Sequence, residues 1–276
     1  MDFTGRTVLV TGANNPRGIG MAIVKAFARA GARVGLLYYR IPPETFGLEL
    51  EDIADAKTSG DPHYHYLRTL TPDAAVQALE AEGCEVAARE ADLTQFENIP
   101  AVFDWCESRW GSVDYLLNVA AICFDNDTIF SADPVAYQRT FQLNVGATYL
   151  LTAEYAKRYQ QHQLESGTVV NFSTDAAQTF AGQVLYGASK AAIEALTRST
   201  AIELGPLGIR VNAIAPGPVQ TGYIPDAYAR NPRDIPLGRV GSPEDIAHSA
   251  LFLCSEQAAW VTGQIFQVSG GHAPLR

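Results

Sequence analysis

The sequence has little positive charge. Among its 276 residues, 20 Lys and Arg face 30 Asp and Glu, which gives a formal net charge of −10. This balance provides no long-range attraction for a polyanion, so we expect neither nucleic acid nor an anionic membrane as a partner. A small-molecule substrate fits the composition better.

Groups of metal-ligating or redox residues are also absent. The four cysteines lie far apart, and no Cys-x-x-Cys pair indicates a metal site or a redox couple. His63 and His65 lie close to Asp61 in the sequence, but structural metal sites usually need four ligands. We therefore expect no metal, and we expect these histidines to pack within a loop.

Long hydrophobic runs and linkers are missing as well. No apolar run reaches the roughly 18 residues of a membrane span, and the opening MDFTGRTVLV lacks the basic and apolar regions of a secretory signal. No repeat and no Gly/Ser or Pro linker divides the chain. We expect a soluble, cytoplasmic protein with one domain over residues 1–276.

The sequence alternates regularly between strand-like and helical segments. Helical spacing occurs at 19–30, 72–82, 95–110, 133–161, 184–204 and 242–254. The apolar runs between them predict strands: TVLV, RVGLLYY, CEVAAR, VDYLLNV, TVVNFS, IRVNAIA and IFQV. Alternating strands and helices imply crossover connections, so the pattern predicts a doubly wound α/β domain, a parallel sheet between two helix layers.

Two segments interrupt this alternation. Residues 41–70 are too long for a simple strand-to-helix connection of about 2 to 6 residues, so we expect an insertion with short elements of its own. Residues 216–241, rich in Pro and Gly, follow a strand, where a substrate loop would lie. In it, Tyr223, Ile224 and Tyr228 are candidate substrate contacts, and a lid that packs only on itself is the alternative.

The stretch TGANNPRGIG follows the first strand and precedes a helix, whose N-terminus favours anions. Gly12 permits a tight exit from the strand, and Gly18 and Gly20 permit close approach of a phosphate and of the sheet. With Asn14 and Ile19, these residues form a candidate dinucleotide site. A purely structural turn is the alternative for the loop taken alone.

The end of the second predicted strand bears on cofactor choice. NAD sites commonly place an acid there for the ribose 2′-hydroxyl, whereas this chain has Tyr38, Tyr39 and Arg40. The missing acid, together with Arg17 in the glycine loop and Arg40, favours NADP(H) over NAD(H). For Arg40, a solvated surface charge is the alternative.

Tyr186 and Lys190 are four residues apart in a predicted helix and therefore share one face. A phenol beside an ammonium has a lowered pKa and can act as a general acid or base toward a carbonyl or alcohol. Tyr-x-x-x-Lys alone is common on surface helices, so context decides. Ser173 and Thr174 end the preceding strand, and either hydroxyl could polarise the same carbonyl.

These features together resemble the short-chain dehydrogenase/reductase family, in its Tyr-x-x-x-Lys branch and close to 3-oxoacyl-ACP reductases. The resemblance covers essentially the whole chain and rests on motifs in the family's order: the glycine loop, ADLT, LLNVAA, FQLNVGA, NFST, YGASKAA, RVNAIAPGPVQT and VTGQIFQVSGG. It implies a Rossmann fold, and a homotetramer or homodimer with the Tyr186 helix and the C-terminal VSGGHAPLR near subunit contacts.

The resemblance also implies residue roles. Tyr186 would be the general acid or base, Lys190 would lower its pKa and bind the nicotinamide ribose, and Asn144 would hold a relay water. Ser173, 13 positions before Tyr186, would orient the substrate oxygen, although the strand motif itself favours Thr174. The remaining implied cofactor contacts are Asp92, Leu93, Asn118, Ala120, Pro216, Gly217, Val219 and Thr221.

Two departures from the family pattern stand out. The glycine loop is two residues longer than the family's common form, and Val119 and Ala121 replace a polar residue and a glycine. The expected activity is NADPH-dependent reduction of a ketone, with a 3-oxoacyl group as one candidate, to a secondary alcohol. The alternatives are an enoyl reductase-like activity and a non-catalytic NADP(H)-sensing protein.

Overall fold

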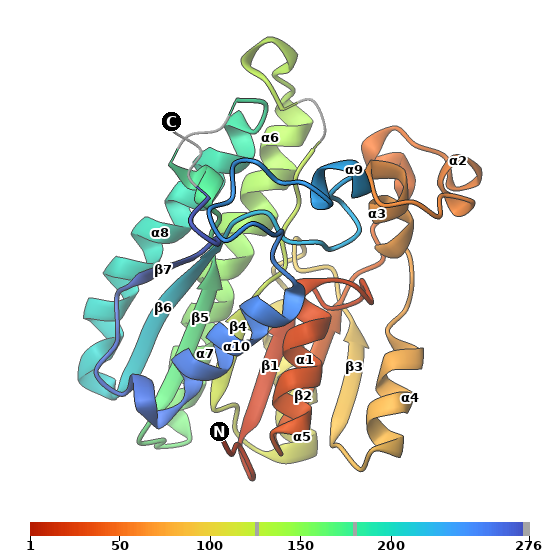
Figure 1. Cartoon of the computed structure of the whole chain (residues 1–276). Helices are drawn as coiled ribbons and strands as arrows, with labels where there is room; N and C mark the ends of the chain where they lie inside the picture. The colour runs from red at the N-terminus through yellow and green to blue at the C-terminus, as the bar shows by residue number, and fades with distance from the viewer. Residues whose placement is uncertain (125–126, 179–180, 273–276) are drawn as a thin grey trace.

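The computed structural model describes residues 1–124, 127–178 and 181–272. One sheet of seven strands has the order β3-β2-β1-β4-β5-β6-β7, with all neighbours parallel (Figure 1). The strands are β1 (Thr7–Thr11), β2 (Arg33–Tyr38), β3 (Val86–Glu90), β4 (Tyr115–Asn118), β5 (Gly167–Phe172), β6 (Ile209–Pro216) and β7 (Ile265–Val268). The strand order reverses between β1 and β4, which is where ligands bind in open parallel sheets.

Helices cover both faces of the sheet, so the predicted doubly wound fold is confirmed. Residues of α1 (Ile19–Arg29), α4 (Asp73–Ala81) and α10 (Pro243–Cys254) pack in one apolar cluster. Residues of α5 (Asn98–Trp110), α7 (Thr148–Gln161) and α8 (Val184–Leu204) pack in the other. Strands buried on both faces explain why their sequences read as continuous apolar runs.

The helix predicted over residues 133–161 is interrupted. It consists of α6 (Pro134–Phe141), a π-helical segment η3 (Gln142–Ala147) and α7. Asp133 begins it by accepting hydrogen bonds from the backbone N–H groups of Val135 and Ala136. A π-helical turn inserts an extra residue without ending the helix, so the helical periodicity on both sides of it still predicts one continuous helix. Such turns often mark functional positions.

Residues 41–70 form three short helices: η1 (Pro43–Phe46), α2 (Leu50–Ala54) and α3 (Asp61–Leu67). His65 packs on Phe46 with ring centroids 4.3 Å apart, and His63 Nδ1 lies 2.6 Å from the carbonyl oxygen of Ala56. The His pair therefore packs within the insertion. The other short elements are η2 (Ile129–Ser131), η4 (Asp175–Ala177), η5 (Gly205–Leu207), α9 (Asp226–Ala229) and η6 (Glu256–Ala258).

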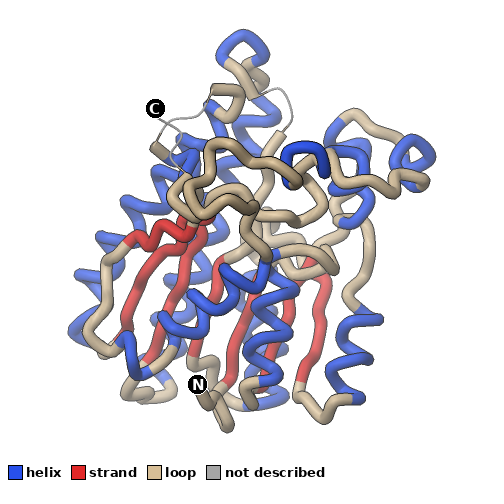
Figure 2. Tube along the Cα trace, in the orientation of Figure 1, coloured by secondary structure: helices blue, strands red, loops and turns tan. Residues whose placement is uncertain are grey.

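The lengthened glycine loop ties the two irregular segments to the sheet. The Asn14 side-chain amide donates to the carbonyl oxygens of Arg68 (2.6 Å) and Leu70 (3.2 Å), and the Asn15 amide donates to that of Thr221 (3.0 Å). Residues 41–70 and 216–241 also meet directly, since the backbone N–H of Gly60 donates to the Gly222 carbonyl (2.8 Å). Figure 2 shows both segments gathered above the carboxyl ends of the strands.

Within the described ranges, no helix has both the length and the apolar character that crossing a membrane requires. Residues 273–276, part of the C-terminal segment expected near subunit contacts, lie outside the described residues.

Replacing Asn14 with Ala should loosen residues 41–70 selectively. The change leaves two carbonyl oxygens without their donor, a loss of about 1 to 3 kcal/mol in local stability. We expect hydrogen exchange of residues 41–70 to accelerate while β1 and β4 keep their protection. Asn212→Ala is the matched control, because Asn212 is also buried and its side-chain amide donates to the Val261 carbonyl instead. Equal exchange in both variants at 41–70 would show that Asn14 does not anchor this segment.

Candidate active site

A cavity of about 920 Å³ lies at the carboxyl edge of the sheet. The glycine loop, the ends of β2, β4, β5 and β6, and helix α8 form its walls, while residues of the 41–70 and 216–241 segments cover it. We call this cavity the cleft. It coincides with the reversal of strand order at β1 and β4, so the fold itself places it.

The glycine loop forms one end of the cleft. A Cβ on Gly12 would lie 2.6 Å from Cα of Ala120, so only glycine permits this approach of the β1 and β4 loops, and its φ is +69°. Gly18 begins α1, and no side chain caps the first turn of that helix. Uncapped backbone N–H groups at a helix N-terminus, beside cleft-lining glycines, fit the phosphates of a dinucleotide.

Most of the expected cofactor residues line the cleft, although they come from six separate parts of the chain. They are Gly12, Asn14, Gly18, Ile19, Gly20, Tyr39, Asp92, Leu93, Ala120, Tyr186, Lys190, Pro216, Gly217, Val219 and Thr221.

The two arginines expected at the 2′-phosphate do not line the cleft. The Arg17 guanidinium is exposed and lies 3.4 Å from Ser59 Oγ. Arg40 forms two hydrogen bonds of 2.9 Å to the carboxylate of Glu90, the last residue of β3. The sequence could not show this pairing, since it joins neighbouring strands 50 residues apart.

Asn118 also lies outside the cleft. Its amide donates to the side chains of Asn171 (2.9 Å) and Thr152 (3.3 Å), between the sheet and α7. Asn171 in turn donates to Thr197 of α8. Asn118 therefore helps to hold β4, β5 and two helices together. The residues that follow it, Val119 and Ala120, are the ones that line the cleft.

Tyr186 and Lys190 of α8 both line the cleft, and the Lys190 ammonium lies 5.6 Å from the Tyr186 ring centroid. Burial raises the pKa of the Tyr186 phenol, and Cys123, Tyr64 and Asp175 raise it further, while Arg68 lowers it. This direction is opposite to the lowered pKa expected from the sequence, because desolvation of the phenol outweighs the charge of Arg68. The phenol is protonated at neutral pH and can donate its proton.

Lys190 is 3% exposed, and its ammonium donates to the carbonyl oxygen of Phe172 at 2.7 Å. Burial lowers the pKa of Lys190 to about 8. The end of β5 therefore fixes the position of the ammonium relative to Tyr186, and a modest rise in pH removes its charge.

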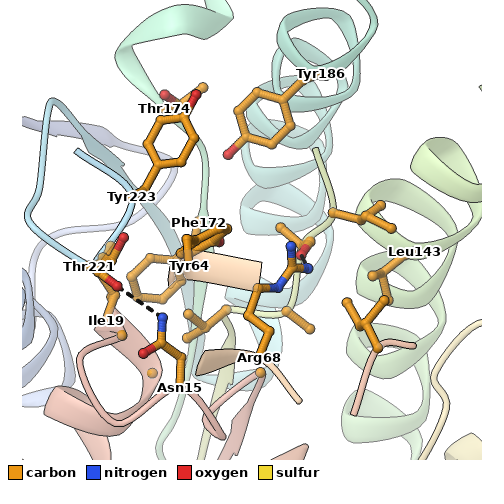
Figure 3. A pocket seen from close by; sticks show the side chains of 18 of the residues that line it. Asn15, Ile19, Tyr64, Arg68, Leu143, Phe172, Thr174, Tyr186, Thr221 and Tyr223 are labelled. Atoms are coloured by element: carbon orange, nitrogen blue, oxygen red, sulfur yellow. Dashed lines mark hydrogen bonds between the residues drawn. The ribbon is translucent and has the colours of Figure 1, made fainter. Parts of the chain in front are cut away.

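The two candidate hydroxyls at the end of β5 differ in their surroundings. Ser173 is 4% exposed and donates to Glu194 Oε1 at 3.0 Å, on the α8 side. Thr174 is less buried, and its hydroxyl accepts a bond of 3.3 Å from the N–H of Ala176. Figure 3 shows Thr174 and Tyr186 on facing sides of the cavity. Thr174 is thus the more accessible of the two.

Asn144 lies in the π-helical segment and is 1% exposed. Its side-chain amide bonds the backbone of Ile122 in both directions, accepting from N–H (2.8 Å) and donating to C=O (3.0 Å), and donates to Ser189 (3.0 Å). Asn144 does not line the cleft itself. It joins the loop after β4 to α8, three residues from Tyr186.

Sequence reasoning missed a chain of polar groups on the substrate side of the cleft. His272 Nδ1 lies 2.6 Å from Asp175 Oδ2, and His272 Nε2 lies 3.5 Å from Asp234 Oδ2. The Tyr228 hydroxyl donates to Asp234 Oδ1 at 2.7 Å. Asp175 belongs to η4, Tyr228 and Asp234 to the 216–241 segment, and His272 to the residues after β7. All four line the cleft. His272 looked isolated in the sequence because its partners are remote.

The expected substrate contacts lie at the upper part of the cleft. Tyr223, Ile224 and Tyr228 all line it, and the Tyr223 ring packs edge-on against Tyr64, with centroids 5.5 Å apart. The 216–241 segment thus packs on the 41–70 segment, and together they roof the cavity.

Comparisons with known proteins agree with this geometry. A family model described as enoyl-(acyl carrier protein) reductase matches residues 63–273. The chain is 34% identical to a 3α-hydroxysteroid dehydrogenase of Mediterraneibacter gnavus, over 98% of both proteins. It is 31% identical to NADPH-dependent aldehyde reductase 1 of Arabidopsis thaliana, over 97% of this chain and 86% of that protein.

Solved structures agree as well. The crystal structure of a 3-ketoacyl-(acyl-carrier-protein) reductase from Brucella melitensis complexed with NADH superposes with a TM-score of 0.77. The two chains are 25% identical, and the match covers 99% of this chain and 100% of the other.

The lowered pKa of Lys190 should appear in the pH dependence of stability. Below about pH 8 the folded protein carries a buried ammonium, which destabilises it relative to an unfolded chain with an ordinary lysine. This destabilisation decreases as pH rises from about 8 toward 10.5. Compared with Lys190→Met, the wild type should therefore gain roughly 2 to 3 kcal/mol in unfolding free energy between pH 7 and pH 10.

Urea denaturation at several pH values measures this difference, and an exposed lysine variant, Lys157→Met, is the control. A difference between wild type and Lys190→Met that does not change with pH would show an ordinary pKa for Lys190.

Proposed function

Because this chain belongs to the short-chain dehydrogenase/reductase family, we propose that it is an NADP(H)-dependent oxidoreductase that interconverts a ketone and a secondary alcohol. The observation that carries this proposal is the shared cleft: Tyr186 and Lys190 line the same cavity as the uncapped N-terminus of α1. A proton donor and a phosphate-binding loop in one enclosed cavity are what carbonyl reduction by a dinucleotide requires.

The nicotinamide supplies hydride to the carbonyl carbon when it is bound. The Tyr186 phenol holds a proton, since burial raises its pKa, and donates it to the carbonyl oxygen as negative charge develops there. The Lys190 ammonium, fixed on the Phe172 carbonyl, stabilises the phenolate that remains. In the reverse direction the phenolate would remove the alcohol proton, and the oxidised nicotinamide would accept the hydride from the carbinol carbon, so the reaction balances both ways.

We propose Thr174 as the hydroxyl that orients the substrate oxygen, in place of Ser173. Both residues line the cleft, but the Ser173 hydroxyl already donates to Glu194, and Thr174 is the less buried of the two, which supports Thr174. Ser173 was favoured because it lies 13 positions before Tyr186, as the family's serine usually does. That argument holds only if the connection between β5 and α8 has the family's usual length. If this connection is one residue shorter here, Thr174 takes the place of the family's serine.

The proposed preference for NADP(H) rests on the end of β2, where Tyr38 and Tyr39 occupy the place of the acid that holds a 2′-hydroxyl. A relative named as NADPH-dependent supports it, whereas the solved structure with NADH shows that the fold also accepts the other cofactor. The substrate is proposed to be a ketone on an apolar body, because aromatic and aliphatic side chains roof the cleft. Two hydroxysteroid dehydrogenases among the relatives make oxosteroids a candidate beside 3-oxoacyl thioesters.

A substrate panel tests the reaction class. Purified protein with NADPH or NADH is offered 3-oxoacyl thioesters, oxosteroids, simple ketones and enoyl thioesters, and cofactor oxidation is followed by absorbance. We expect turnover with at least one ketone class and a lower KM for NADPH. Turnover with enoyl thioesters alone would replace ketone reduction with enoyl reduction. Tight NADPH binding without any turnover would indicate a sensing protein.

Tyr186→Phe should abolish proton donation without disturbing the fold. We expect kcat to fall roughly 10²- to 10⁴-fold, while the Kd of NADPH stays within about twofold. Tyr149→Phe is the matched control, because that phenol is half-exposed on α7 and does not line the cleft. Retention of kcat in Tyr186→Phe would mean that another group supplies the proton.

The two hydroxyl variants separate Thr174 from Ser173. Thr174→Val should lower kcat on the order of 10²-fold with little change in melting temperature. Ser173→Ala should instead lower stability by about 1 kcal/mol, since Glu194 loses a donor, and change kcat only a few-fold. The reverse order of the two kcat values would return the role to Ser173.

A further inference from the structure

Arg68, the residue after α3, is an arginine for which the described residues provide no anionic partner. Its side chain is buried, with the residue 7% exposed, and its guanidinium lies over the rings of Phe46 (5.3 Å) and Tyr64 (5.1 Å). Within the part of the chain that is described, its side chain makes one hydrogen bond, a long one of 3.4 Å to the carbonyl oxygen of Ala121, and no ion pair. Elsewhere in the molecule, the partly buried Arg158 pairs with three carboxylates.

A guanidinium has five N–H donors and never loses its charge in a protein, so burial with one weak acceptor is costly. Such groups are normally paired with a carboxylate or a phosphate. The two aromatic rings hold the guanidinium in place but accept none of these hydrogen bonds in its plane. A ligand anion would satisfy it.

The Arg68 side chain reaches into the cleft. Figure 3 shows it extending between Asn15 of the glycine loop and Leu143, below Tyr186. Its backbone carbonyl accepts the Asn14 hydrogen bond, so the glycine loop itself fixes the residue. Its one side-chain acceptor, Ala121, follows Ala120, which packs against Gly12. Arg68 thus stands beside the two loops that approach each other at the phosphate cradle.

Few other cations compete for this role. Among the described residues, the Lys and Arg side chains that line the cleft are Arg68, Arg139 and Lys190. Lys190 is already bound to Phe172, and Arg139 is exposed on α6. Arg68 is therefore the one buried guanidinium that a ligand phosphate in the cleft can meet.

We propose that Arg68 binds a phosphate group of the dinucleotide cofactor, and that residues 41–70 form a strap that carries this cation over the cleft. The inference rests on the proposed function, since it takes a phosphate-bearing dinucleotide as the ligand. The planar guanidinium can hold two phosphate oxygens at once. The diphosphate and the 2′-phosphate present the same chemistry, and the comparison of NADPH with NADH separates them.

The test is the Kd of NADPH and of NADH, measured by titration calorimetry for wild type, Arg68→Gln and Arg68→Lys. We expect Arg68→Gln to bind roughly 10- to 100-fold more weakly, the loss typical of a charge-assisted hydrogen bond. The Kd of Arg68→Lys should lie between those of wild type and Arg68→Gln, because lysine keeps the positive charge but lacks the planar guanidinium. A loss shared by both nucleotides assigns the diphosphate, and a loss confined to NADPH assigns the 2′-phosphate.

Arg109→Gln is the matched control, because that guanidinium also lies over an aromatic ring, Trp105 at 4.9 Å, and is outside the cleft. Its nucleotide Kd should equal that of wild type. Unchanged nucleotide Kd in both Arg68 variants would overturn the proposal, and so would an effect confined to the KM of a carboxylate-bearing substrate. If wild type bound neither nucleotide, both this proposal and the proposed function would fall.

Discussion

The side-chain amides of Asn14 and Asn15 hold the active cleft together. Both belong to the lengthened part of the glycine loop, and one bonds the 41–70 segment while the other bonds the 216–241 segment. The extra loop residues, which departed from the family pattern, thus act as the anchor of the roof. Despite the added residues in the loop, Gly18 and Gly20 still line the cleft.

Enclosure determines the acid–base chemistry of the cleft. Removal from water disfavours every charged form, so it raises the pKa of Tyr186 and lowers that of Lys190 to about 8. A phenol with a raised pKa keeps its proton at neutral pH, which is the form that a proton donor needs. An ammonium whose pKa is about 8 changes its protonation with small changes in the surrounding charge. The fixed charge of Arg68 opposes the burial effect at Tyr186. The roof that carries Arg68 therefore acts on the pKa of Tyr186 as well as covering the cleft.

The fold, and the placement of Tyr186 and Lys190 on one helix at the cleft, could be predicted because local patterns encode them. β-branched runs and helical spacing identified all seven strands and the layer helices, and the spacing of Tyr186 and Lys190 placed them on one face of α8. Side-chain partners remote in sequence could not be predicted in this way. Arg40 meets Glu90, Asn118 meets Asn171, and His272 meets Asp175, each by a register or loop path that no local pattern specifies. The π-helical segment around Asn144 was hidden for a different reason, since helical periodicity continues on both sides of it.

The distribution of bonds shows how firmly the roof is attached. The 216–241 segment is held by the Asn15 and Gly60 hydrogen bonds at one end. At the other end it is held by the Asp234–His272 contact and by the backbone N–H of Leu237, which donates to the Gly270 carbonyl at 3.0 Å. The 3.5 Å Asp234–His272 contact is long and its carboxylate is half-exposed, so the backbone bond of Leu237 is the firmer attachment there. The 41–70 segment has both Asn14 bonds and its own aromatic cluster. Each segment of the roof is therefore attached at more than one point, because bonds from the glycine loop and bonds from outside it act together.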